Sequence, residues 1–179
     1  AAECAVRVFC SAYRLAPETC FPGAVDDAEE SYRYLLSKGY TPQQITLCGE
    51  SAGGGLIYAL CLRLKEKSLP LPNGIIAISP WVDLTLSGES YETNRENDPS
   101  LTEELLRFYA ECYAGDETNP EVSPLFGDLE GLPPSLIFVG GDEILLDDSR
   151  RMHEKLLQAG CKSRLVIAPE RWHAYVLYM

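Results

Sequence analysis

Apolar residues recur along the chain in two patterns, and together they predict an α/β architecture. Short apolar runs indicate strands, and longer stretches with apolar positions three and four residues apart indicate amphipathic helices. The predicted strands cover residues 4–13, 45–48, 74–79, 135–140 and 163–168, and the predicted helices cover residues 24–38, 52–67, 100–114 and 147–159. Because strands alternate with helices, we expect a doubly wound, mostly parallel sheet.

The segment 80–134 interrupts this alternation. It is long and rich in proline, and it contains one convincing helix, preceded by a Ser100–Glu103 capping box. An insertion of this size within one domain of residues 1–179 favours a lid or cap over plain packing. We expect the helix to bury the apolar face formed by Leu101, Leu105, Phe108, Tyr109 and Cys112.

The length, net charge and cysteine content of the chain exclude several classes of partner and substrate. A chain of 179 residues with 46% apolar residues suits one domain with a buried core. Its net charge of −12 disfavours nucleic acid, anionic membranes and anionic substrates. No apolar stretch is long enough to span a membrane, and no signal peptide is visible. Seven scattered cysteines fit reduced thiols in a cytoplasm, without a metal site.

The candidate nucleophile is Ser51, in a Gly-x-Ser-x-Gly motif between the strand 45–48 and the helix 52–67. This context indicates a nucleophile elbow, in which the serine occupies a strained turn. We expect Gly49 and Gly53 to be required because a Cβ at either position would clash with neighbouring backbone. The N–H of Ala52, at the start of the helix, is a candidate oxyanion donor.

A serine needs a base, and the base needs a carboxylate to fix its tautomer. His153 lies within a predicted amphipathic helix and is interpreted as a surface histidine, whereas His173 follows the last strand, at the sheet edge where Ser51 lies. Asp142 follows the strand 135–140 and is the predicted acid, with Glu143 as its rival. We interpret the remaining acids nearby as residues that satisfy free N–H groups at a helix start, namely Asp147 and Asp148.

Five motifs resemble, in order, the hormone-sensitive-lipase family of α/β-hydrolases, especially its bacterial acetyl esterase-like members. They are YRLAPE at 13–18, GESAGG at 49–54, PWVDL at 80–84, SPL at 123–125 and GDEIL at 141–145. The resemblance implies a carboxylesterase that hydrolyses short acyl esters of small molecules through an acyl-enzyme intermediate, without a cofactor. It assigns Ser51 as nucleophile, Asp142 as acid and His173 as base.

The chain also departs from that family. The family carries a His-Gly-Gly-Gly segment upstream of its YRLAPE loop and a helix after its histidine, and neither is present in residues 1–179. We therefore expect a chain truncated at both ends, a sheet without its N-terminal strands, and weak catalysis by these residues alone. Two other functions stay open: a peptidase or amidase of the same fold, and a non-catalytic small-molecule binding protein.

Overall fold

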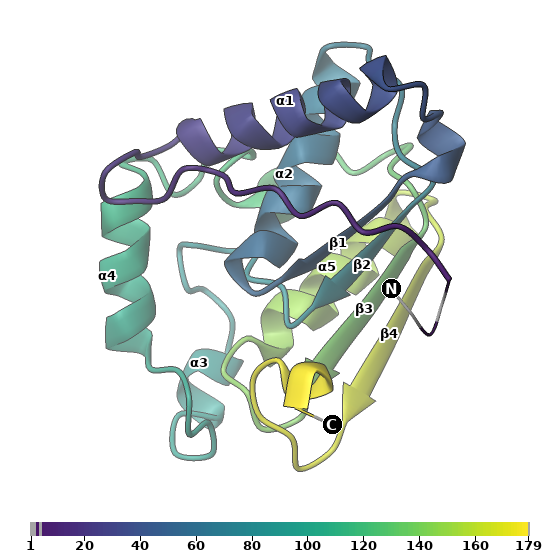
Figure 1. Ribbon diagram of the computed structural model, residues 1–179. Helices are drawn as coiled ribbons and strands as arrows, with labels where there is room; N and C mark the ends of the chain where they lie inside the picture. Colours follow the sequence, from purple (N-terminus) through teal and green to yellow (C-terminus); the bar gives the residue numbers. More distant parts are fainter. Residues whose placement is uncertain (1–2, 4, 179) are drawn as a thin grey trace.

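The computed structural model describes residue 3 and residues 5–178. A single four-stranded sheet lies at its centre, with the strands side by side in chain order (Figure 1). All three strand pairs are parallel. The strands are β1 (Thr46–Glu50), β2 (Gly74–Ile78), β3 (Ser135–Gly140) and β4 (Ser163–Ala168). This confirms the predicted parallel sheet, and the predicted bounds of β3 and β4 match the structure.

Five α-helices accompany the sheet among the described residues: α1 (Gly23–Ser37), α2 (Ala52–Glu66), α3 (Ser90–Thr93), α4 (Glu103–Tyr113) and α5 (Leu146–Gln158). Side chains of α2 and α5 share one core cluster with β2 and β3, so both helices cover the same face. This follows from the strand order, because successive right-handed crossovers in one direction leave their helices on one side.

The chain begins differently from the prediction of a strand at 4–13. Cys4 lies outside the described residues, and residues 5–13 join no strand of the described sheet. They run along α1 instead (Figure 1), where Ser11 Oγ lies 2.7 Å from Ser31 Oγ and the Phe9 and Tyr34 ring centroids lie 6.0 Å apart. A strand needs a partner for its backbone, and this segment does not pair with β1, which is an edge strand of the described sheet.

The helix of the 80–134 segment starts later than predicted. Thr102 is its N-cap and accepts a hydrogen bond from Leu105 N at 3.2 Å, whereas the Ser100 hydroxyl bonds Asp98. The predicted buried face was wrong. Leu106 and Ala110, one turn apart, are the buried residues. The apolar side chains left exposed on the helix are Leu105, Phe108 and Tyr109.

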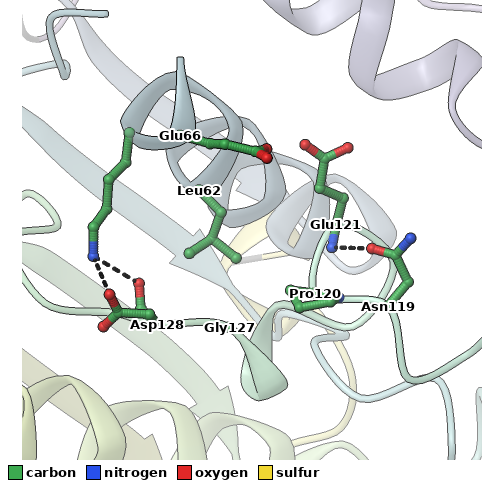
Figure 2. Close-up of a pocket in the computed structure, with 8 residues that line it drawn as sticks. Leu62, Glu66, Asn119, Pro120, Glu121, Gly127 and Asp128 are labelled. Atoms are coloured by element: carbon green, nitrogen blue, oxygen red, sulfur yellow. Dashed lines mark hydrogen bonds and ion pairs between the residues drawn. The ribbon is translucent and has the colours of Figure 1, made fainter. Parts of the chain in front are cut away.

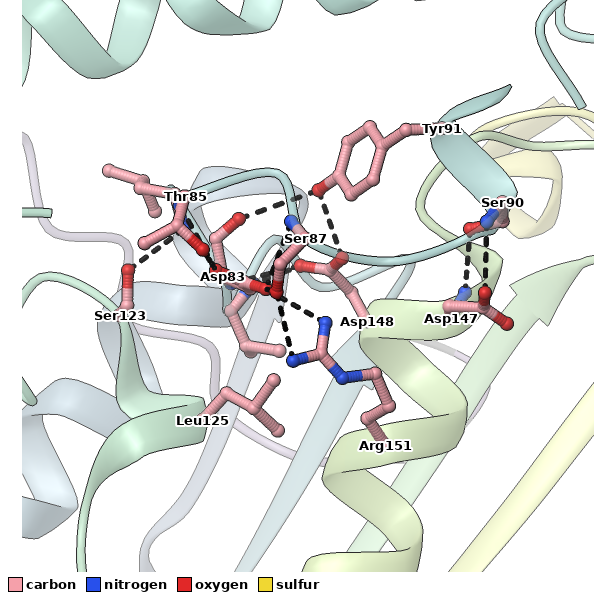
Figure 3. A network of polar contacts seen from close by, with 12 residues as sticks. Asp83, Thr85, Ser87, Ser90, Tyr91, Ser123, Leu125, Asp147, Asp148 and Arg151 are labelled. Carbon is pink, nitrogen blue, oxygen red and sulfur yellow. Dashed lines mark hydrogen bonds and ion pairs between the residues drawn. The ribbon is translucent and has the colours of Figure 1, made fainter. Parts of the chain in front are cut away.

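Buried acidic side chains attach the first part of that segment to α5 (Figure 3). Asp148 Oδ2 accepts hydrogen bonds from Val82 N and Asp83 N, each at 2.9 Å, and Tyr91 Oη donates to Oδ1 at 2.9 Å. Burial raises the pKa of Asp148 to about 7. Asp83 is also buried and pairs with Arg151 at 2.8 Å.

Asp147 and Asp148 accept hydrogen bonds from backbone N–H groups, as predicted. The donors, however, lie in the segment 82–90 and not at the start of their own helix. Asp147 Oδ2 accepts from Ser90 N at 2.9 Å, and Asp148 accepts from residues 82 and 83. These aspartates therefore attach the segment 82–90 to the first turn of α5.

Within residues 3 and 5–178, no helix combines the length and the apolar character that crossing a membrane requires.

Candidate active site

Ser51 lies in a sharp turn between the end of β1 and the start of α2. Its backbone has φ 53° and ψ −121°, a strained conformation for a residue with a Cβ. Two backbone hydrogen bonds hold the turn, from Ser51 N to Ile78 O at 2.9 Å and from Trp81 N to Ser51 O at 3.0 Å. The predicted elbow is therefore present, and the Ser51 side chain is partly exposed at the C-terminal edge of the sheet.

Close packing leaves no room for a Cβ at three glycine positions around the elbow, and only one of them, Gly49, was predicted. A Cβ on Gly49 would overlap the Gly53 carbonyl, as expected. A Cβ on Gly53 itself would meet only the Tyr13 hydroxyl, at 3.8 Å, so the expected clash there was wrong. The crowded positions are the next two, where a Cβ on Gly54 would lie 2.7 Å from Pro80 Cβ and one on Gly55 would overlap the Trp81 carbonyl.

The carboxylate that faces His173 belongs to Glu143. Its Oε2 lies 2.9 Å from His173 Nδ1, and Glu143 is completely buried. Asp142, the predicted acid, is only partly buried, and its backbone N donates to Arg171 O at 3.0 Å. The carboxylate beside the imidazole is therefore that of the rival residue, Glu143, and not that of the predicted Asp142. The turn after β3 directs position 143 inward, where the Gly140 N–H and the Ser79 hydroxyl bind the carboxylate.

The other ring nitrogen of His173 faces a second carboxylate. Nε2 lies 3.4 Å from Glu50 Oε1, and among the described residues no hydrogen bond joins the ring to Ser51 Oγ. Burial alone would lower the pKa of His173, but hydrogen bonds to Glu143 and Glu50 raise it to about 9. The imidazole in this arrangement holds a proton more tightly than an ordinary histidine.

Ala52, the candidate oxyanion donor, lies at the helix start predicted from the sequence, and His153, which was not assigned to the site, lies within the predicted helix. Ala52 is the first residue of α2, where N–H groups have no acceptor within the helix. His153 lies on α5, away from the elbow, and its Nδ1 is 2.8 Å from Ser163 Oγ on β4.

Two polar residues that hold the Glu143 turn were not predicted from the sequence. Ser79 Oγ lies 2.8 Å from Glu143 Oε1, and Asn94 Nδ2 donates to the backbone carbonyls of Glu143 at 2.9 Å and Gly141 at 3.1 Å. Ser79 follows a strand at the same sheet edge as the predicted site, which was an available signal. Asn94 had none, because it comes from the interrupting segment.

A hollow of about 570 Å³ lies elsewhere, between the second half of α2 and the loop at 119–128 (Figure 2). Charged side chains line much of it, and Lys65 is already bound there by Asp128 at 2.7 Å. Ser51, Glu143 and His173 do not line it, so it is separate from the candidate site.

A family described by the alpha/beta hydrolase fold matches residues 1–177. The chain belongs to the α/β-hydrolase family. It is 42% identical over 169 residues to an esterase of Acinetobacter venetianus and 44% identical over 168 residues to an acetyl-hydrolase of Streptomyces hygroscopicus. Each alignment covers 93% of this chain and 56% of the relative.

Solved structures agree with this family. An esterase of the bacterial hormone-sensitive lipase family superposes with a TM-score of 0.90 at 43% identity, covering 92% of this α/β-hydrolase chain and 56% of the other. The predicted resemblance is therefore confirmed. The chain spans about half the length of the curated relatives it matches.

Proposed function

We propose that the protein is a serine carboxylesterase that hydrolyses short, uncharged acyl esters through Ser51, His173 and Glu143. The observation that carries this proposal is the buried Glu143–His173 pair at the sheet edge where the strained Ser51 elbow lies. A base oriented by a buried carboxylate is what a serine hydroxyl needs to become nucleophilic at neutral pH. The esterase and acetyl-hydrolase relatives support the same chemistry.

In the proposed mechanism, Nε2 of neutral His173 turns from Glu50 to Ser51 and removes the hydroxyl proton as Ser51 Oγ attacks the ester carbonyl. Glu143 keeps the proton on Nδ1 and stabilises the imidazolium that forms. The Ala52 N–H donates to the developing oxyanion. The imidazolium then protonates the departing alcohol, and water activated by His173 hydrolyses the acyl-enzyme.

Charge and surface support the substrate class. A net charge of −12 disfavours anionic acyl groups. The exposed Phe108 and Tyr109, whose ring centroids lie 5.9 Å apart on α4, suit a cap of residues 80–134 that covers a small apolar acyl group.

The unpaired state of the described cysteines supports a reducing, cytoplasmic location.

The test compares Ser51→Ala with Ser37→Ala, a serine on the exposed end of α1, in the protein as its gene encodes it. We expect Ser51→Ala to reduce p-nitrophenyl acetate turnover by about 10⁴-fold or more, with an unchanged melting temperature, because the nucleophile is lost. Ser37→Ala should match the parent. Ser51→Ala turnover above about a tenth of the parent would rule out Ser51 as nucleophile. Faster turnover of an acetyl anilide than of the matching ester would favour an amidase.

A further inference from the structure

The turn at residues 79–81, which follows β2, contacts the nucleophile side of the candidate site. Trp81 N donates to Ser51 O at 3.0 Å. The neighbouring Pro80 packs so closely on the first turn of α2 that a Cβ on Gly54 would lie 2.7 Å from it. The turn therefore fixes the backbone on which Ser51 is mounted.

The same turn reaches the acid and the base through one hydroxyl. Ser79 Oγ lies 2.8 Å from Glu143 Oε1 and 3.0 Å from the N of Ala174, the residue after His173. Ser79 is completely buried, so solvent does not compete for these bonds. One side chain thus touches both the carboxylate and the loop that carries the imidazole.

The hydrogen-bond directions follow from the chemistry of the groups. An ionised carboxylate only accepts, so the Ser79 O–H donates to Glu143 Oε1, and the Ala174 N–H donates to the Ser79 oxygen. With the Gly140 N–H also bonded to Oε1, the second oxygen of Glu143 is left for His173 Nδ1. Ser79 therefore selects which carboxylate oxygen meets the imidazole.

The backbone on both sides of this contact is unusual. Ser79 has φ 46° and Ala174 has φ 55°, both in the left-handed region that residues with a Cβ seldom adopt. Such conformations persist only where the surroundings determine them, and they concentrate at functional sites. Here each left-handed residue is one partner of the Ala174–Ser79 hydrogen bond.

We propose that Ser79 is a positioning residue that sets the orientation of Glu143 and of the His173 loop, and so keeps the imidazole in the tautomer that can act as a base. This proposal rests on the proposed function for its kinetic consequence. Its structural consequence, the state of the His173 Nδ1 proton, can be measured without turnover.

The experiment uses Ser79→Ala and Ser79→Gly in the protein as its gene encodes it. Glycine adopts a left-handed φ freely, so Ser79→Gly removes the hydroxyl while it relieves the backbone. For both variants we expect kcat for p-nitrophenyl acetate to fall about 10- to 100-fold with KM within about threefold, because the base is misoriented while binding is intact. We also expect the downfield ¹H resonance of the His173 Nδ1–H to shift or broaden in both.

Ser135→Ala is the matched control, because Ser135 is a buried serine at the opposite end of the sheet, where its hydroxyl donates to the Pro133 carbonyl. It should leave kcat and the resonance unchanged. A Ser79→Gly variant with parental kcat and a parental resonance would overturn the positioning role and leave only a backbone role. Turnover that survives Ser51→Ala would instead overturn the proposed function, and the resonance would still decide the role of Ser79.

Discussion

The candidate site has two halves, the Glu143–His173 pair and the Ser51 elbow, and they differ in how many hydrogen bonds hold their side chains. The acid–base half, on the β3 and β4 side, is buried: Glu143 accepts hydrogen bonds from three groups, and its turn is held by Asn94. The nucleophile half lies on β1, an edge strand, and the Ser51 hydroxyl is not hydrogen-bonded to the imidazole.

The acid–base pair is thus formed although no hydrogen bond joins the imidazole to the Ser51 hydroxyl among the described residues. The Glu143–His173 pair needs only the ends of β2, β3 and β4 and the loops that follow them. The elbow needs close backbone packing beside β1, and His173 Nε2 is paired with Glu50 instead of Ser51.

The largest effect in this set is expected from the elbow. Gly49→Ala should reduce esterase activity more than about 100-fold and lower the melting temperature, because its Cβ would overlap the Gly53 carbonyl and displace Ser51. Gly53→Ala is the matched control and should keep activity within a few-fold, because a Cβ there meets only an atom at 3.8 Å. Equal losses in the two variants would mean that close packing does not define the elbow.

An intermediate effect is expected from the second carboxylate on His173. The base works only when neutral, so a pKa of about 9 predicts that kcat/KM is lost as the pH falls below about 9. Glu50→Gln removes one charge that favours the imidazolium and should shift this limb to lower pH, raising kcat/KM several-fold at pH 7. Glu18→Gln, remote from His173 in the YRLAPE loop, should leave the limb in place. If the acid side of the kcat/KM pH profile did not move in Glu50→Gln, Glu50 would not raise the pKa of His173.

The same histidine affects stability with a defined sign. Its folded-state pKa is raised from 6.5 to about 9, so its contribution to the unfolding free energy is full below pH 6.5 and is lost as the pH rises through 9.

The smallest effect on activity is expected in the Asp148 network, which attaches the 82–90 segment to α5. With the pKa of Asp148 raised from 3.8 to about 7, its contribution to stability is full below pH 3.8 and is lost as the pH rises through 7. The parent should therefore lose stability as the pH is raised from 4 to 8, whereas Asp148→Asn should not. The unfolding free energy of Asp148→Asn minus that of the parent should increase by more than about 1 kcal/mol over this range. Asp148→Ala should lose more than about 2 kcal/mol, because three donors lose their acceptor. A relative stability of Asp148→Asn that is constant with pH would disprove the raised pKa.

Much of the scaffold could be predicted because its signals are local. The apolar runs at 135–140 and 163–168 gave the bounds of β3 and β4, and His173 could be chosen over His153 by its place after a strand. The segment 5–13 has a strand-like pattern, but a strand also requires a partner, which the pattern does not encode. The buried face of α4 depends on which neighbours it meets.

The acid illustrates the limit of sequence reasoning most clearly. Asp142 and Glu143 are adjacent, both follow β3, and both carry a carboxylate. What separates them is the direction of the turn at Gly140–Gly141, whose backbone packs against the His173 loop so closely that a Cβ on Gly140 would overlap the Arg171 carbonyl. That contact joins distant parts of the chain, and residue type and order do not reveal it.

A comparison of Glu143→Gln with Asp142→Asn tests whether Glu143 is the carboxylate of the proposed triad. We measure kcat/KM for p-nitrophenyl acetate from pH 6 to 10 in the protein as its gene encodes it. We expect a loss of about 10³- to 10⁴-fold for Glu143→Gln, because the amide favours the wrong imidazole tautomer, and a change within about threefold for Asp142→Asn. A larger loss in Asp142→Asn than in Glu143→Gln, with both variants folded, would contradict the assignment.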